Sequence, residues 1–286
     1  NGSTPGGTCT AQVVTSINSS GVPTCTTANS TQTFNASGTF TVPALINRVW
    51  VQVWAGGAGG AGGTTTGGGT GGPGGGYAEL WCAVTPGAAV TVTVGTGGAL
   101  GAAGAVGSAG NNSVFGTCVT ILGGFAQATT ATPTRGGSDN ALNTPLTGTA
   151  LYFTRGVTPD VAGTICTAAN AANGLISLVG IGLGGCSTAP PTADGVGAAG
   201  GRGLYGGGSG GSGAFGVATT RVGGTGGTSG YGGAGGNGDS VLNGTPQTDC
   251  SAGTQPGGGG GGGAGKAVSG ATAGCTGGDG RVVVWW

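Results

Sequence analysis

Glycine recurs in this chain with a period of three residues, and that period constrains the fold more than any other feature. Residues 56–63 repeat a Gly-Gly-Ala triplet, and residues 67–76 continue it with Thr70 and Pro73 in the third place. In the run 223–238, the third place is held by Thr225, Thr228, Tyr231, Ala234 and Asn237. Three residues per turn is the period of a polyproline II helix, which differs from the periods of α-helices and β-strands.

A polyproline II helix makes no hydrogen bonds within itself, so it needs partners in order to be ordered. Glycine retains its N–H and has no Cβ, so several such helices can approach closely and bond to one another. We therefore predict a bundle or layer of polyglycine-type helices. The alternative is flexible glycine linkers. Collagen is disfavoured, because the triplets are interrupted and the chain has only 12 prolines.

Alternating apolar and polar residues predict β-strands between the glycine runs. Residues 48–54 read Arg-Val-Trp-Val-Gln-Val-Trp, and residues 90–94 alternate valine with threonine. Further strand candidates are residues 77–84, 113–122 and 281–286. No stretch has the pattern of a long amphipathic helix, so the fold class is all-β.

Composition sets limits on partners and on location. The 77 glycines among 286 residues would by themselves indicate low complexity. However, hydrophobic residues make up 36% and only 7 basic and 7 acidic residues occur, so the chain is apolar enough to form a packed core. A net charge of zero argues against binding nucleic acid or an anionic membrane surface. The most apolar stretch, residues 175–183, is too short to span a bilayer.

The eight cysteines predict disulfide bonds. They include no C-x-x-C pair, and the chain has no histidine to complete a zinc site. Disulfides imply an oxidising, extracellular location, whereas the alternative is free thiols in a reducing cytosol. Among the many possible connectivities, a sequential pairing is our choice: Cys9 with Cys25, Cys82 with Cys118, Cys166 with Cys186, and Cys250 with Cys275.

The polar N-terminal region is expected to form a separate connector or collar, residues 1–38. Cys9 and Cys25 bracket a strand-like segment and the turn residues 18–23, which predicts a hairpin closed by a disulfide. Residues 39–286 are then one glycine-rich domain.

Several of these segments, taken in order, resemble the glycine-rich domain of phage tail-fibre and related bacterial surface proteins. They are Phe-Thr-Val-Pro at 40–43, the strand 48–54 running into glycines 56–60, Gly-Gly-Gly-Tyr-Ala-Glu at 74–79, residues 84–95, and Gly-Asp-Gly-Arg-Val-Val-Val-Trp at 278–285. Residues 7–25 are similar to cysteine-bracketed connectors of long extracellular fibres.

The resemblance implies a β-sandwich whose first and last strands pair, and the cysteines predict that disulfides stabilise it. It also implies glycine-rich excursions that pack as polyglycine helices and carry loops touching a host receptor. Eight cysteines are unusual for that group, and the insertion 129–191 has no counterpart that aligns.

The sequence patterns typical of enzymes are incomplete or expected by chance in this chain, so we predict no catalytic, cofactor or metal site. Without histidine the usual base of a serine or cysteine hydrolase is missing. Residues 207–211 fit the G-x-S-x-G pattern, but a chain so rich in glycine produces it by chance. Residues 260–266 nearly spell a phosphate-binding loop, yet Ala267 stands where Ser or Thr is needed.

The candidate contact residues are aromatic or terminal. Tyr205, Phe215 and Tyr231 lie within glycine runs, where an exposed ring offers binding area to a sugar or a partner, although capping the bundle explains them equally well. The terminal residues Val282, Val283, Val284, Trp285 and Trp286 are candidates for a strand that pairs with a neighbouring subunit.

Two functions fit these features. The first is a non-enzymatic adhesin tip that presents loops to a cell-surface receptor, either a glycan or an outer-membrane component. The alternative is a self-assembling subunit of an extracellular filament or sheath, polymerising by strand addition of residues 1–38 or 282–286. Near-zero charge would ease self-association and favours an oligomer or polymer.

Overall fold

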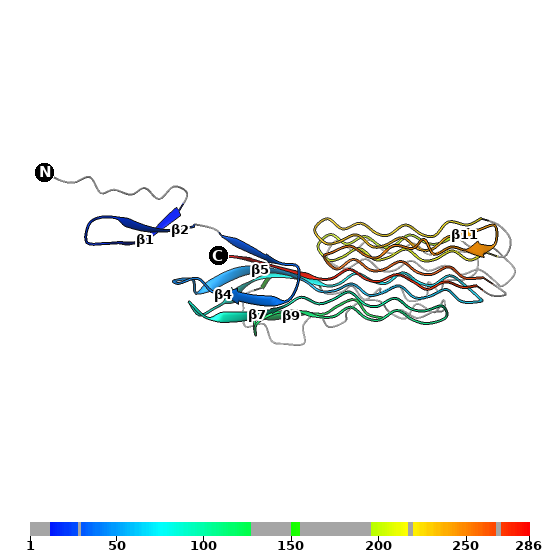
Figure 1. Cartoon of the computed structure of the whole chain (residues 1–286), viewed down its shortest axis with the longest axis horizontal. Coiled ribbons are helices and arrows are strands. Elements are labelled where there is room, and N and C mark those ends of the chain that lie inside the picture. The colour runs from blue at the N-terminus through cyan, green and yellow to red at the C-terminus, as the bar shows by residue number, and fades with distance from the viewer. Residues whose placement is uncertain (1–11, 28–29, 127–149, 155–195, 217–219, 267–269) are drawn as a thin grey trace.

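The computed structural model describes residues 12–27, 30–126, 150–154, 196–216, 220–266 and 270–286. In this part of the chain a β-sandwich is followed by a bundle of extended glycine-rich segments, and the N-terminal hairpin lies at the sandwich end (Figure 1). The described residues contain strands and no helix, as the sequence predicts. Most of the insertion 129–191 lies outside them.

Two antiparallel sheets form the sandwich. The first has the order β10 (Ala150–Thr154), β6 (Tyr77–Ala83), β5 (Arg48–Trp54), β13 (Arg281–Trp285) and β3 (Thr31–Phe34). The second has the order β4 (Gly38–Thr41), β7 (Ala89–Thr93), β8 (Ser113–Phe115) and β9 (Val119–Ile121). Two hairpins lie outside the sandwich, β1 (Gln12–Ile17) with β2 (Pro23–Thr27) and β11 (Val241–Leu242) with β12 (Thr245–Pro246).

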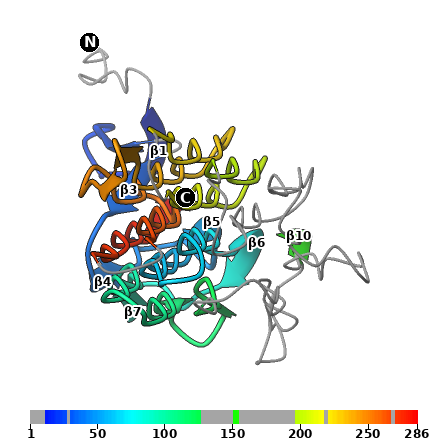
Figure 2. The same ribbon diagram turned by 90° about the vertical axis from the view of Figure 1, so that its right-hand side faces the viewer.

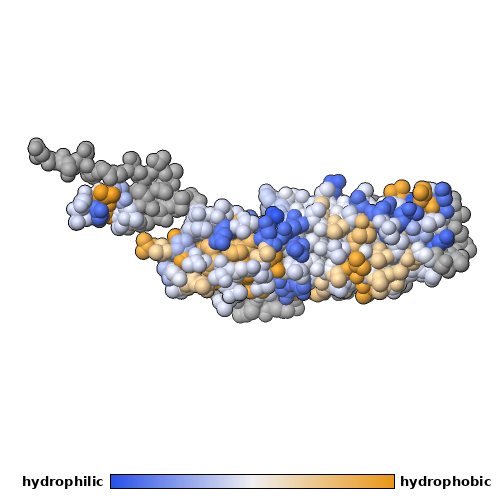
Figure 3. All heavy atoms as spheres, in the orientation of Figure 1, coloured by the Kyte–Doolittle hydropathy of each residue, from blue (hydrophilic) through white to orange (hydrophobic). Residues whose placement is uncertain are grey.

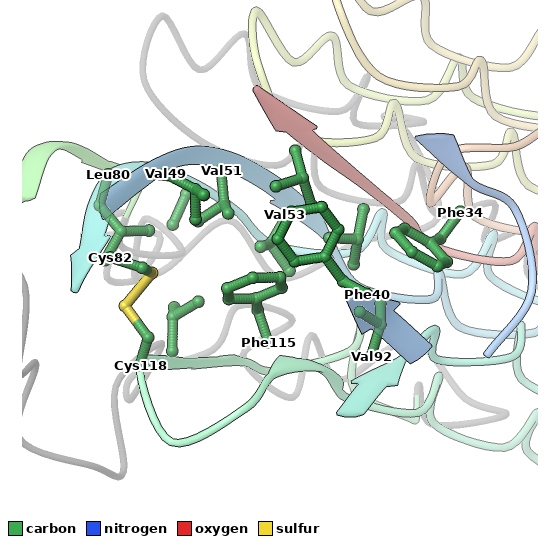
Figure 4. Packing of buried hydrophobic residues seen from close by; sticks show 14 of the residues in the cluster. Phe34, Phe40, Val49, Val51, Val53, Leu80, Cys82, Val92, Phe115 and Cys118 are labelled. Atoms are coloured by element: carbon green, nitrogen blue, oxygen red, sulfur yellow. A yellow bond between two sulfur atoms is a disulfide. The ribbon is translucent and has the colours of Figure 1, made fainter. Parts of the chain in front are cut away.

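The sandwich core follows from the alternation that the sequence shows. Val49, Val51 and Val53 of β5 are fully buried and face the aromatic rings of Phe40 and Phe115 from the opposite sheet (Figure 4). The disulfide between Cys82 and Cys118 lies at one end of this core and joins the two sheets, with Cα atoms 5.8 Å apart. The core therefore depends on contacts between sheets that only the complete fold brings together.

Residues 113–122 form two strands where the sequence predicts one. Gly116 has a φ of +51°, and the N–H of Cys118 bonds to the carbonyl of Phe115, which turns the chain between β8 and β9. The apolar pattern runs through this turn, so periodicity alone does not reveal it.

Each glycine segment next to the sandwich is a direct continuation of a strand. Residues 55–63 follow β5, residues 67–76 lead into β6, and residues 95–104 follow β7. Residues 105–112 lead into β8, and residues 271–280 lead into β13. Viewed along the bundle, these segments lie side by side in a packed array (Figure 2).

The hydrogen bonds of residues 55–63 show a helix with three faces. The N–H groups of Ala55, Ala58 and Ala61 donate to carbonyls of residues 70–76. In each triplet, the N–H of the glycine that follows the alanine donates to residues 105–111, and the N–H of the second glycine donates to residues 272–278. All of these N···O distances are 2.9 to 3.0 Å. This pattern confirms polyglycine-type packing, and the alternative of flexible linkers is wrong for these segments.

The seven consecutive glycines 257–263 occupy a position surrounded by other segments. Their N–H and C=O groups bond to six neighbours, which are residues 58–61, 69–75, 208–211, 236–239, 251–254 and 275–279. A Cβ at Gly261 would lie 1.7 Å from the carbonyl oxygen of Asn237, and one at Gly259 would lie 1.8 Å from that of Gly72. Because backbone approaches from every side, this segment has no room for the non-glycine residue that marks other triplets.

The sandwich begins earlier than the predicted domain boundary at residue 38. β3 pairs with β13, and Ser30 exchanges backbone hydrogen bonds with Trp286. The boundary therefore falls inside the sandwich and the prediction is wrong. The short, polar segment Thr31–Phe34 has mostly exposed side chains, so its sequence pattern does not distinguish it from the threonine-rich connector before it.

The N-terminal hairpin is present as the sequence predicts. The side chain of Asn18 accepts the N–H groups of Ser20 and Val22, and Gly21 has a φ of +77°. Cys9 and the side chain of Cys25, which would close the hairpin, lie outside the described residues.

The C-terminal strand is an interior strand of its own sheet. Val282, Val283, Val284 and Trp285 pair with β5 on one side and with β3 on the other, and Trp286 bonds to Ser30. Both edges of β13 are thus occupied. The prediction that this strand is available to a neighbouring subunit is wrong, because open edges depend on the order of strands and not on their sequence.

Candidate binding surfaces

The end of the bundle away from the sandwich carries a group of turns, which we call the tip surface: Thr64–Gly67, residues 220–222 and residues 240–246 (Figure 1). The N–H of Thr64 bonds to the carbonyl of Gly67 and closes the first turn. Asn243 and Gly244 have φ values of +49° and +70°, as in the two-residue hairpin that an Asn-Gly pair favours.

Large apolar side chains are exposed on the tip surface and next to it. Val196, Val222 and Leu242 are between 51 and 67% exposed, and an apolar patch is visible at this end of the molecule (Figure 3). The N–H of Gly197 bonds to the carbonyl of Val222, and Arg221 forms a two-way backbone bridge with Val241. These contacts fix the backbone of turns whose side chains point to solvent.

A second candidate surface lies at the opposite end of the bundle, where it meets the sandwich. Trp54, Tyr77, Tyr205 and Tyr231 form a column of rings, which we call the aromatic ladder. Successive centroids are 4.8, 5.5 and 5.1 Å apart, and the two Tyr–Tyr steps are nearly parallel, with interplanar angles of 11° and 7°.

The three aromatic residues predicted to contact a partner have different environments. Tyr231 is 60% exposed, Tyr205 is half-buried inside the ladder, and Phe215 is fully buried. The prediction for Phe215 is therefore wrong. Residues 207–216 form an interior segment whose side chains all face neighbouring segments, and the glycine pattern does not distinguish interior from exterior helices.

The two sequence motifs typical of enzymes lie within the hydrogen-bonded bundle. Ser209 of the G-x-S-x-G match is fully buried, and its hydroxyl accepts the N–H of Gly201 at 2.7 Å. In residues 260–265, backbone N–H groups bond to carbonyls of other segments, such as Gly260 to Ala58. These groups of both motifs are thus bonded to neighbouring segments of the bundle.

One carboxylate is buried in the bundle. Asp239 accepts hydrogen bonds from the hydroxyl of Thr272 and the N–H of Cys250, and it is fully buried. Burial raises the pKa of Asp239, and the two hydrogen bonds oppose that shift. At the sandwich junction, burial and the neighbouring Glu79 carboxylate raise the pKa of Tyr77, whose hydroxyl donates to that carboxylate.

Two disulfides occur in the described residues, and both are sequential pairs. Cys82 bonds to Cys118 in the sandwich, and Cys250 bonds to Cys275 in the bundle. Cys9, Cys166 and Cys186 lie outside the described residues. The two observed disulfides indicate a non-reducing environment.

Within the described ranges, no group of three acidic or cysteine side chains is placed to hold a metal ion. The same ranges contain no helix long and apolar enough to cross a membrane.

Comparison with known proteins identifies a family for this chain. A family model described as a glycine-rich domain matches residues 29–286, so its start agrees with the position of β3. A comparison with curated proteins finds no match. Because the family model covers the sandwich and the whole bundle, the chain belongs to the glycine-rich domain family.

Proposed function

We propose that this chain is a non-enzymatic extracellular binding module that presents the tip surface to a receptor on a cell. The role is that of a phage tail-fibre or surface adhesin tip. The observation that carries the proposal is the gathering of exposed turns at one end of the bundle, away from the sandwich and the N-terminal hairpin (Figure 1).

The bundle suits this role because it is a rigid support. Its segments are bonded to one another through the backbone, so turns such as Thr64–Gly67 are anchored on both sides. A binding loop that is already ordered loses little conformational entropy when it binds. Binding residues placed on loops over a rigid scaffold are a common arrangement.

The disulfides support the extracellular location. Covalent links between sheets and between bundle segments stabilise a protein that works outside the cell, where no reducing system maintains thiols. The receptor would be a surface glycan or an outer-membrane component, and the exposed Val222 and Leu242 would supply apolar contact area.

The test is binding of the full chain to whole bacterial cells and to purified lipopolysaccharide. Val222→Asp combined with Leu242→Asp should weaken binding by about tenfold or more, since each exposed anchor is expected to contribute about 1 kcal/mol or more. The matched control is Ile17→Asp with Leu45→Asp, two exposed apolar residues in the N-terminal hairpin and in the loop between β4 and β5, away from the tip surface. Equal binding by both double variants would contradict the proposal.

A filament or sheath subunit is the second candidate. It draws support from residues 96–109, which carry no charged side chain and expose Leu100 and Val106. Such a face would join subunits by lateral packing and not by addition of the C-terminal strand. Helical polymers in electron micrographs of the purified chain, lost in the Leu100→Asp, Val106→Asp variant, would favour this candidate over the adhesin tip.

A further inference from the structure

We propose that Tyr231 and the aromatic ladder beneath it form a carbohydrate-binding platform, separate from the tip surface, that takes the flat face of a neutral pyranose ring. This inference goes beyond receptor binding by the tip, because it assigns a different site and a ligand class to the junction between bundle and sandwich.

The last ring of the ladder, Tyr231, has an open face. Tyr205 stacks on one face of Tyr231, with centroids 5.1 Å apart and an interplanar angle of 7°. Even so, Tyr231 is 60% exposed, so the face that points away from Tyr205 is open to solvent. The ladder thus ends in a flat aromatic surface at the position where a further ring would continue the stack.

The turn that carries Tyr231 is held in place before any ligand arrives. The N–H groups of Gly230 and Tyr231 donate to the carbonyl of Leu204 at 3.1 and 2.9 Å. The hydroxyl of Ser229 donates to the carbonyl of Gly206, and the indole N–H of Trp54 donates to that of Tyr205 at 2.8 Å. A fixed ring loses little entropy on binding.

Packing between the sandwich and the bundle does not explain why an aromatic ring stands at Tyr231. Tyr77 is almost completely buried and Tyr205 is half-buried, so these two rings are the part of the ladder that packs within the protein. Tyr231 adds a ring that mostly faces water. An exposed aromatic ring gains little from burial in the free protein, so its contact area is available to a ligand.

The size and charge of the site favour a sugar over other partners. Among the described residues of this turn, Tyr231 and Leu204 are the exposed large apolar side chains, whereas each partner of a stable protein interface contributes roughly 20–30 residues. A nucleic acid would need phosphate-neutralising charge, and the chain has a net charge of zero. The C–H face of a pyranose matches one aromatic ring in size and meets its electron-rich face.

The experiment is saturation-transfer NMR on the full chain with neutral oligosaccharides of glucose, galactose and N-acetylglucosamine as probes. We expect signal from the ring C–H protons of at least one probe. Tyr231→Ala should weaken its Kd by about tenfold, the loss of one stacked ring contact, and Tyr231→Phe should keep it within about twofold. An unchanged melting temperature in both variants would show that the fold is intact.

The control separates this site from the tip surface. Val222→Asp with Leu242→Asp should bind the oligosaccharide as well as the wild type while losing cell binding. The platform is refuted if none of the probes gives a signal, or if Tyr231→Ala binds as tightly as the wild type. Loss of oligosaccharide binding in the tip variant alone would also overturn it, because the sugar site would then be the tip surface.

Discussion

At the scale of single residues, a bundle glycine such as Gly261 is required by the neighbouring backbone and not by an unusual backbone conformation. A Cβ at Gly261 would overlap the carbonyl oxygen of Asn237 at 1.7 Å, and a backbone carbonyl cannot rotate away as a side chain can. By contrast, a Cβ at Gly38 in β4 would meet its nearest atoms, in the ring of Phe34, at 3.4 Å. These two glycines differ in environment although both lie in extended chain.

We therefore expect Gly261→Ala to lower the free energy of unfolding by about 3 kcal/mol or more, because the added methyl forces two bundle segments apart. Gly38→Ala is the matched control, and it should change stability by less than about 1 kcal/mol. Urea denaturation followed by tryptophan fluorescence measures both. Similar losses in the two variants would show that backbone contact is not what selects glycine in the bundle.

Asp239 makes stability depend on pH in the direction opposite to that of a salt-bridged carboxylate. Burial raises its pKa in the folded state above the unfolded value of about 3.9. The folded chain therefore binds this proton more tightly than the unfolded chain does. The associated stability is fully present below the unfolded pKa and is lost as the pH rises through the folded pKa.

Asp239→Asn should remove this dependence. The amide oxygen can still accept the N–H of Cys250, while the amide nitrogen can donate to Thr272, whose hydroxyl has the carbonyl of Ala264 within 3.4 Å as another acceptor. Unfolding free energies measured at several pH values between 3 and 8 should fall with pH more steeply in the wild type than in the variant. Parallel curves would refute this role of Asp239.

At the scale of elements, each glycine segment is stable only as part of the array. Residues 55–63 donate their N–H groups to three different segments, and no bond closes within the segment itself. Burial in the exterior segments follows the same period: Gly224 and Gly227 are buried, while Thr225 and Thr228 are exposed. In these exterior triplets, the glycine before the threonine therefore faces the bundle interior, and the threonine faces solvent.

Hydrogen exchange measures this arrangement directly. We expect the amides of residues 257–263 to exchange slowly, at rates set by opening of the whole bundle, because every one of them donates to another segment or to a turn carbonyl. Thr65 and Thr66 of the tip surface, which are exposed, should exchange within seconds to minutes. Fast exchange throughout residues 257–263 would mean that the glycine run is a flexible linker after all.

At the scale of the whole molecule, the sandwich and the bundle form one continuous structure. Strands β5, β6 and β13 run directly into glycine segments, so the order of strands in the sandwich also fixes which segments lie beside each other in the bundle. The same continuity places turns such as Thr64–Gly67 at one end and the ring of Tyr231 at the other. The proposed tip and sugar sites are separated for this reason.

Local features of the molecule could be predicted from the sequence because they depend on the period of the chain. Alternation identified β5 with its observed bounds, 48–54, and the triplets identified the polyglycine segments. The order of cysteines also matched the two observed disulfides, Cys82–Cys118 and Cys250–Cys275. The period of a segment shows which of its residues share a face, and this does not depend on the segments that pack against it.

Only the tertiary structure decided what lies against each face. Phe215 and Tyr231 both stand in glycine-rich sequence, yet one is buried in an interior segment and the other is exposed. The C-terminal strand was placed between β3 and β5, which removes its open edges. The physical reason is that polyglycine helices and strands have no internal hydrogen bonds. Their hydrogen-bond partners lie in other segments, so a local sequence pattern does not predict which segments those are.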